Sequence, residues 1–189
     1  MLAQMALLMF GFWAGAVPFG VLIAKWLGVD IRDHGSGNIG ATNVTRVLGP
    51  LPGAIVLVLD ATKGALPTWL AIRYSGDPFT VMATGFAAIL GHCFSPFLEF
   101  RGGKGVATAL GVFLVLAPSF VVFGALVFVT VLQLTKVPAL GSLAGALTIA
   151  ISFAIHRERE AAVLAFLVFV LLVFTHRTNL AKLRAGKPV

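Results

Sequence analysis

Cysteine and charged residues are both scarce in this chain. Its 189 residues include one cysteine, Cys93, and only 11% are charged, with 7 acidic side chains against 14 lysines and arginines. A single cysteine excludes an internal disulfide and a cysteine-based metal cluster. Tandem histidine ligands are missing as well, and no Ser-His-Asp order is legible. We therefore predict no metal, no cofactor and no catalytic triad.

Apolar residues, in contrast, are abundant. They make up 59% of the sequence, and the mean hydropathy is +1.00. Several windows hold the roughly 20 apolar residues that a membrane-spanning helix requires, so a soluble domain is excluded. The net charge of +7 would suggest nucleic acid in a soluble protein. Here the basic residues flank apolar runs, where they suit anionic lipid headgroups. We predict contact with membrane lipid and no nucleic-acid partner.

Five apolar runs each predict one spanning helix: Ala3–Trp26, Pro52–Tyr74, Pro78–Phe94, Pro138–Ile155 and Ala161–Thr175. The first run is too long for a signal-peptide core and lacks a basic start, so we expect a permanent span. A sixth run, 106–135, is 30 residues long. As one helix it would measure about 45 Å, against a hydrocarbon core of about 30 Å. Ala117-Pro118-Ser119 is a turn signal within it.

Charge asymmetry decides whether this sixth run is one helix or two. With the N-terminus outside and a split at Pro118, ten lysines and arginines are cytoplasmic and three are outside, namely Arg73, Arg157 and Arg159. Without the split, the count is seven to six. Cytoplasmic segments carry the excess of basic residues. We therefore predict an all-α polytopic membrane protein with seven transmembrane helices, an outside N-terminus and a cytoplasmic C-terminus.

Two glycine-rich polar segments interrupt the apolar chain on the predicted cytoplasmic side. The first is Gly35–Asn43, closed by Arg46, and the second is Arg101–Gly105. Glycine lets a backbone approach a ligand closely, and helix-start N–H groups beside a cation favour an anion. The two segments, with the basic tail that begins at His176, predict a site for phosphate chemistry at the membrane surface.

Nucleotide-binding interpretations of these segments fail on their context. Gly35-x-Gly37-x-x-Gly40 matches the dinucleotide fingerprint literally, but neither a preceding strand nor a βαβ unit is present. The segment around Lys104 is not a Walker loop, because Leu98 stands five residues before Gly103. The anion-binding physics does not depend on those folds.

Several polar side chains have both a functional and a purely structural interpretation. Arg46 can bind phosphate bidentately and Lys104 offers a mobile charge, yet both could simply anchor helix ends to headgroups. Asp60 and Lys63, spaced i, i+3, form either a neutralised pair facing the bundle or an ionisable pair lining a site. His92 is either a packing residue or a substrate contact.

The motifs carry a family resemblance. Ser36–Arg46 resembles the first signature of the bacterial membrane glycerol-3-phosphate acyltransferases that use acyl phosphate. Gly91-His92 with Phe100–Thr108 resembles the second signature, and His176-Arg177-x-Asn179-Leu180 resembles the third. The match covers nearly the whole chain. Departures from the family pattern are Glu99 where glycine is usual, Pro96 as a displaced proline, Thr178 for the common Glu, and Lys182 for Arg.

The resemblance implies a single integral-membrane acyltransferase domain over residues 1–189, in the bacterial cytoplasmic (inner) membrane, with its active site on the cytoplasmic side. It would transfer an acyl group from acyl phosphate to the sn-1 hydroxyl of glycerol 3-phosphate, giving lysophosphatidic acid and phosphate. An enzyme that produces acyl phosphate would be a functional partner. The sequence leaves the oligomeric state open, and a monomer is compatible with it.

The same resemblance assigns candidate residues. Catalytic roles fall to Ser36, Arg46, Lys104, His176 and Asn179. Substrate binding falls to Gly37, Asn38, Gly40, Thr42, Asn43, His92, Gly102, Gly103, Gly105 and Ser142. By its position alone, Ser142 is suited to close helix packing together with Gly141 and Gly145.

Two other function classes are considered beside the enzyme. A transporter for phosphorylated solutes also uses glycine-broken helices near its site, but here the polar motifs gather on one face and no inverted repeat is visible. A non-catalytic lipid-binding protein would leave the paired anion motifs without a purpose.

Overall fold

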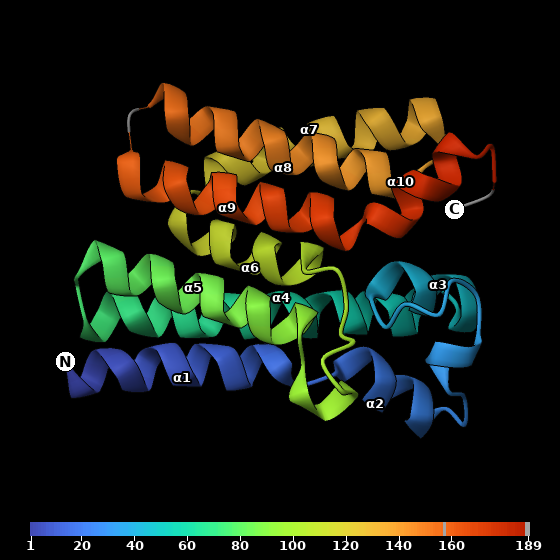
Figure 1. Ribbon diagram of the computed structural model, residues 1–189, viewed down its shortest axis with the longest axis horizontal. Coiled ribbons are helices and arrows are strands. Elements are labelled where there is room, and N and C mark those ends of the chain that lie inside the picture. Colours follow the sequence, from blue (N-terminus) through green and yellow to red (C-terminus); the bar gives the residue numbers. More distant parts are fainter. Residues whose placement is uncertain (157, 188–189) are drawn as a thin grey trace. The chain divides into compact units, whose positions relative to one another are not determined.

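The computed structural model describes residues 1–156 and 158–187, and these contain α-helices and two short 3-10 helices but no β-strand. The described part of the chain is therefore all-α, as predicted. By its contacts the chain divides into two compact units, Met1–Val112 and Phe113–Val189, which are described in turn. Figure 1 shows the helices with their labels.

The first unit is built on three long helices that pack against one another, α1, α4 and α5 (Figure 1). Its elements in chain order are α1 (Leu2–Ala16), α2 (Phe19–Trp26), η1 (Ile31–Asp33), α3 (Ala41–Leu48), α4 (Pro50–Tyr74), α5 (Pro78–Cys93) and η2 (Pro96–Leu98), followed by the start of α6 (Val106–Leu116). The glycine-rich segments lie between η1 and α3 and between η2 and α6. Cys93, at the end of α5, is buried.

The second unit contains α7 (Pro118–Thr135), α8 (Pro138–Ile155), α9 (Arg159–Thr175) and α10 (Arg177–Arg184). Helix α8 packs against both α7 and α9. A Cβ at Gly145 would press on the Gly124 carbonyl of α7, so this glycine permits close approach, as its sequence context predicted. The Phe120 ring meets Phe153 edge-on at 4.9 Å and lies 4.8 Å from His156.

Within the described residues, five segments are long and apolar enough to cross a membrane: Leu2–Trp26, Pro50–Tyr74, Pro78–Leu98, Pro118–Thr135 and Pro138–Ile155. A sixth would be α9 with α10, which are bent by 54° at His176. The predicted split at Pro118 is confirmed, and α6, with 11 residues, spans only about 16 Å. Seven crossings and the orientation remain predictions, and Arg157, used in the charge count, lies outside the described residues.

The first apolar run, predicted as one helix, is broken in the structure. Helix α1 ends at Ala16, and α2 begins at Phe19. Pro18 has no N–H, so it cannot continue the helical hydrogen bonds, and carbonyls of the last turn of α1 need other donors. Hydropathy alone does not register such a break.

Helices α1 and α5 approach each other through glycine. A Cβ added at Gly15 of α1 would collide with the backbone of Ala88, and one at Gly91 of α5 would collide with the backbone of Phe12.

We therefore expect Gly15→Ala to lower the free energy of unfolding by about 1–3 kcal/mol, because backbone rather than a flexible side chain must move. Thermal unfolding in detergent measures this. The control Ala6→Val enlarges an exposed side chain on the same helix, and an equal loss there would contradict the interpretation.

Candidate active site

One buried side chain, Asn43, organises the first glycine-rich segment. Its Oδ1 accepts a hydrogen bond from the Ser36 backbone N–H at 2.8 Å. Its Nδ2 donates to the carbonyls of Asn38 at 2.9 Å and His34 at 3.0 Å. Both functions of the amide are thus used inside the loop, and the loop closes around a residue that is only 3% exposed.

The same segment is anchored to the core of the first unit. Ile39 and Val44 are buried in a cluster with Val21, Ala24, Ile31 and Val56, which come from α2, η1 and α4. Gly20 of α2 permits close approach of the Ile39 carbonyl, since a Cβ there would collide with it. The Asn38 Oδ1 accepts from the Gly40 N–H at 2.8 Å, directly before α3. The backbone of the segment is therefore held from both sides.

The remaining candidate side chains of this segment lie at its surface. Ser36 and Thr42 are exposed, and so is Arg46 in the last turn of α3. Arg32, nearby in sequence, is committed to Asp30 through Nε at 2.9 Å and Nη2 at 2.6 Å. These hydrogen bonds hold the pKa of the Asp30 carboxyl well below its usual range. Arg32 was not a predicted site residue, and this pairing gives it a local structural role.

The second glycine-rich segment folds back onto the end of α5. The Gly102 N–H donates to the Cys93 carbonyl at 3.1 Å, and the Gly103 N–H donates to the His92 carbonyl at 3.0 Å. A Cβ at Gly103 would collide with the His92 ring, so glycine is required for this approach. Lys104 follows, half-buried, and Gly105 leads into α6.

Glu99 departs from the family pattern at a position with unusual backbone geometry. Its φ is 52°, in the left-handed region, and Phe100 follows with a φ of 61°. Glycine adopts this conformation without steric cost, whereas other residues are strained there by about 1–2 kcal/mol. The structure thus keeps a turn suited to glycine although the chain carries glutamate.

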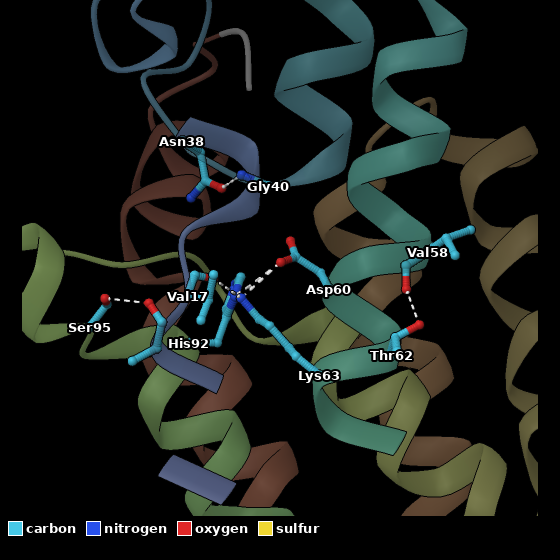
Figure 2. A network of polar contacts seen from close by, with 10 residues as sticks. Val17, Asn38, Gly40, Val58, Asp60, Thr62, Lys63, His92 and Ser95 are labelled. Atoms are coloured by element: carbon cyan, nitrogen blue, oxygen red, sulfur yellow. Dashed lines mark hydrogen bonds and ion pairs between the residues drawn. The ribbon is translucent and has the colours of Figure 1, made fainter. Parts of the chain in front are cut away.

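A buried polar cluster lies beside the second segment (Figure 2). Lys63 Nζ is 2.8 Å from Asp60 Oδ1, and His92 Nδ1 is 3.8 Å from the same oxygen. Asp60 and Lys63 are 2% and 5% exposed, so they form the internal ion pair that one of the two sequence interpretations described. His92 is equally buried and packs on Gly103; its predicted contact with substrate stays a prediction.

Sequence reasoning missed Ser95. Its hydroxyl donates to the Ala16 carbonyl at 2.6 Å, and Lys63 Nζ donates to the Val17 carbonyl at 2.8 Å (Figure 2). These two side chains supply donors at the break between α1 and α2. A serine between an apolar span and Pro96 was the available signal, but its partner lies 79 positions away in the sequence.

The other candidate residues belong to the second unit. Ser142 Oγ donates to the Pro138 carbonyl of its own helix at 3.0 Å. His176 is buried between α9 and α10, and its Nδ1 lies 2.8 Å from the Leu172 carbonyl. Because a carbonyl only accepts, Nδ1 carries the hydrogen in this contact, which fixes the orientation of the ring. Asn179 follows three residues later on α10, so it shares a face with His176.

No group of three His, Cys, Asp or Glu side chains able to hold a metal lies within residues 1–156 and 158–187. What the first unit offers instead is two glycine-held loops carrying Arg46 and Lys104. The second unit offers His176 and Asn179. These groups can bind anions and donate hydrogen bonds.

We expect Asn43→Asp to destabilise the protein by about 1–3 kcal/mol, because it keeps the acceptor for Ser36 but removes the amide donor to the part-buried Asn38 and His34 carbonyls. Thermal unfolding and hydrogen exchange of residues 34–43 measure this. The matched control is Asn38→Asp, which keeps the Oδ1 that Gly40 uses. Equal effects at both positions would show that added charge, rather than the lost donor, is responsible.

Known proteins resemble this chain along nearly its whole length. The family model for glycerol-3-phosphate acyltransferase matches residues 5–186. A protein of that name from Myxococcus xanthus is 54% identical over 181 residues, 94% of each chain. One from Thermotoga petrophila is 42% identical over 178 residues, 93% of this chain and 90% of the relative.

Two solved structures agree with these sequence relatives. Both are described as PlsY (YgiH), an integral membrane glycerol 3-phosphate acyltransferase, one in the glycerol 3-phosphate form and one in the lysophosphatidic acid form. Their TM-scores are 0.95 and 0.93 at 35% identity, and each match covers 99% of this chain and 94% of the other. With its long apolar helices the protein is thus a multi-pass membrane protein, and the chain belongs to the glycerol-3-phosphate acyltransferase family.

Proposed function

We propose that the protein transfers an acyl group from acyl phosphate to the sn-1 hydroxyl of glycerol 3-phosphate, releasing lysophosphatidic acid and inorganic phosphate. Glycerol-3-phosphate acyltransferase activity is supported by the family match along the chain and by relatives of that name. The observation that carries the choice of donor is the pair of glycine-held loops, one bearing Arg46 and the other Lys104. Two phosphate-bearing substrates would use two such loops.

The reaction needs little covalent chemistry from the protein. The glycerol hydroxyl oxygen attacks the carbonyl carbon of the mixed anhydride, and the bond from that carbon to the phosphate oxygen breaks. Phosphate leaves with the electron pair. Because phosphate is a good leaving group, no acyl-enzyme is required. The hydroxyl proton passes to a substrate phosphate oxygen. Orienting the two reactants and neutralising their charge then supply the acceleration.

Different candidate residues bind phosphate and orient the substrates. Arg46 and Lys104 bind phosphate and stabilise developing charge. Ser36, His176 and Asn179 orient glycerol 3-phosphate or the reacting carbonyl, and the bond from His176 to Leu172 holds the imidazole in place for this role. Substrate-binding surface comes from backbone and side chains of Gly37, Asn38, Gly40, Thr42, Gly102, Gly103, Gly105 and Ser142. Asn43 and His92, both buried, contribute through the loops that they hold.

The setting of the reaction belongs to the same proposal. The two units act as one acyltransferase domain over residues 1–189. The chain crosses the bacterial cytoplasmic membrane seven times, with the N-terminus outside and the site facing the cytoplasm. The acyl tail lies among the helices while the mixed anhydride meets the polar loops. A neighbouring enzyme that makes acyl phosphate supplies the donor.

The donor assignment is tested with the purified protein in detergent or lipidic mesophase. We expect palmitoyl phosphate with glycerol 3-phosphate to give lysophosphatidic acid and phosphate in equal amounts, and palmitoyl-CoA to give none, because the site is built for a phosphate leaving group. Product from palmitoyl-CoA alone would overturn the donor. Binding of glycerol 3-phosphate without product from either donor would favour a transporter.

Charge removal tests the two phosphate-binding residues. We expect Arg46→Ala and Lys104→Ala each to lower kcat/KM by about 100-fold or more, since each removes charge stabilisation of the transition state. Both variants should keep the thermal midpoint of the parent. The control is Arg73→Ala, which removes an exposed cation at the end of α4. Parent-like turnover in either site variant would remove that residue from the mechanism.

A further inference from the structure

The ion pair between Asp60 and Lys63 lies where burying a charge carries a large desolvation penalty. Both side chains are almost fully buried, and they lie inside Pro50–Tyr74, one of the apolar segments long enough to cross a membrane. A buried pair often stabilises a fold no better than apolar side chains of the same volume. A contribution to stability therefore does not explain why the pair is present, whereas the contacts of its two side chains suggest a role.

Lys63 reaches from α4 to the break in the first span. Its Nζ donates to the Val17 carbonyl at 2.8 Å (Figure 2). The same Nζ lies 5.7 Å from the centre of the ring of Phe19, the first residue of α2. Helix α2 starts immediately after this contact. Gly20, the next residue, receives the Ile39 carbonyl of the first glycine-rich segment. A short chain of contacts thus joins Lys63 to the loop of Ser36 and Asn38.

Asp60 is connected to the second glycine-rich segment through His92. His92 Nδ1 is 3.8 Å from Asp60 Oδ1, and the edge of the same ring packs on Gly103. The His92 carbonyl accepts the Gly103 N–H at 3.0 Å, next to Lys104. Gly64, beside Lys63, lies against the Thr108 carbonyl of α6, the helix that follows Lys104. The second loop is thus held on the same stretch of α4 as the first.

We propose that Asp60, Lys63 and His92 form a positioning network that sets the register between the two phosphate-binding loops. These residues act through the loops and do not touch the reacting atoms. The carboxylate locates the ammonium, the ammonium fixes the α1–α2 break, and the imidazole supports Gly103. The kinetic part of this inference rests on the proposed acyltransferase function; the part concerning loop geometry does not.

The decisive variant removes both charges at once. Asp60→Asn with Lys63→Met keeps the volumes similar and leaves no unpaired charge, so the protein should stay folded, with a thermal midpoint lowered only by the lost bond from Lys63 to the Val17 carbonyl. We expect kcat/KM to fall about 100-fold, because displacement of reacting groups by about 1 Å costs that much. Hydrogen exchange at the Gly102 and Gly103 amides should accelerate without substrate. The control is Thr62→Val, whose hydroxyl bonds only within α4, to the Val58 carbonyl.

The kinetic constants and the amide exchange rates of the variants test the network. Parent-like kcat, KM and loop exchange in the charge-free double variant would overturn the network. Should that variant fail to fold, His92→Asn takes its place, since it withdraws the ring from Gly103 and leaves the ion pair intact. Unchanged exchange and turnover in His92→Asn would equally overturn the inference. If the parent protein makes no lysophosphatidic acid from any donor, the proposed function fails, and exchange at Gly102 and Gly103 alone decides the positioning role.

Discussion

Every backbone polar group inside a lipid bilayer must find its partner within the protein, and the first unit is arranged around one place where a helix cannot provide it. Pro18 ends α1, and Ser95 and Lys63 then donate to the Ala16 and Val17 carbonyls. Beyond the break, Gly20 of α2 lies directly against the Ile39 carbonyl of the first glycine-rich segment. A backbone defect is thus satisfied by side chains that also connect neighbouring helices.

The two glycine-rich segments of the site are held in different ways, one by glycines and the other by an asparagine side chain. Glycines at 102 and 103 let one loop lie directly on α5 and its histidine, while the Asn43 amide ties the other loop through its own carbonyls. Neither loop needs regular secondary structure to be rigid. A fixed backbone favours anion binding, because donors that are already in position stabilise a charge without first having to reorganise. The exposed Arg46 and Ser36 are therefore carried by well-held chain.

Sequence patterns predicted the parts of the fold that depend on local signals. Proline before an apolar run and a polar residue after it gave Pro138–Ile155 its bounds, and the proline at 118 split the longest run as expected. The break at Pro18 was missed because hydropathy is unchanged across it. Asp60 was predicted as a partner of Lys63, but the backbone oxygens that Lys63 and Ser95 contact could not be predicted, since they are 46 and 79 positions away. The sequence motifs identified the two glycine-rich segments but did not identify the contacts that hold them in place.

The single cysteine has a practical consequence for following these loops in solution. Cys93 is 4% exposed at the end of α5, so the folded protein presents almost no reactive thiol. A cysteine introduced on either glycine-rich segment would be the accessible one, and a fluorophore or spin label could be attached there without first removing the native residue. Reaction at Cys93 itself would then report opening of α5, separating local motion of a loop from loss of the helix beneath it.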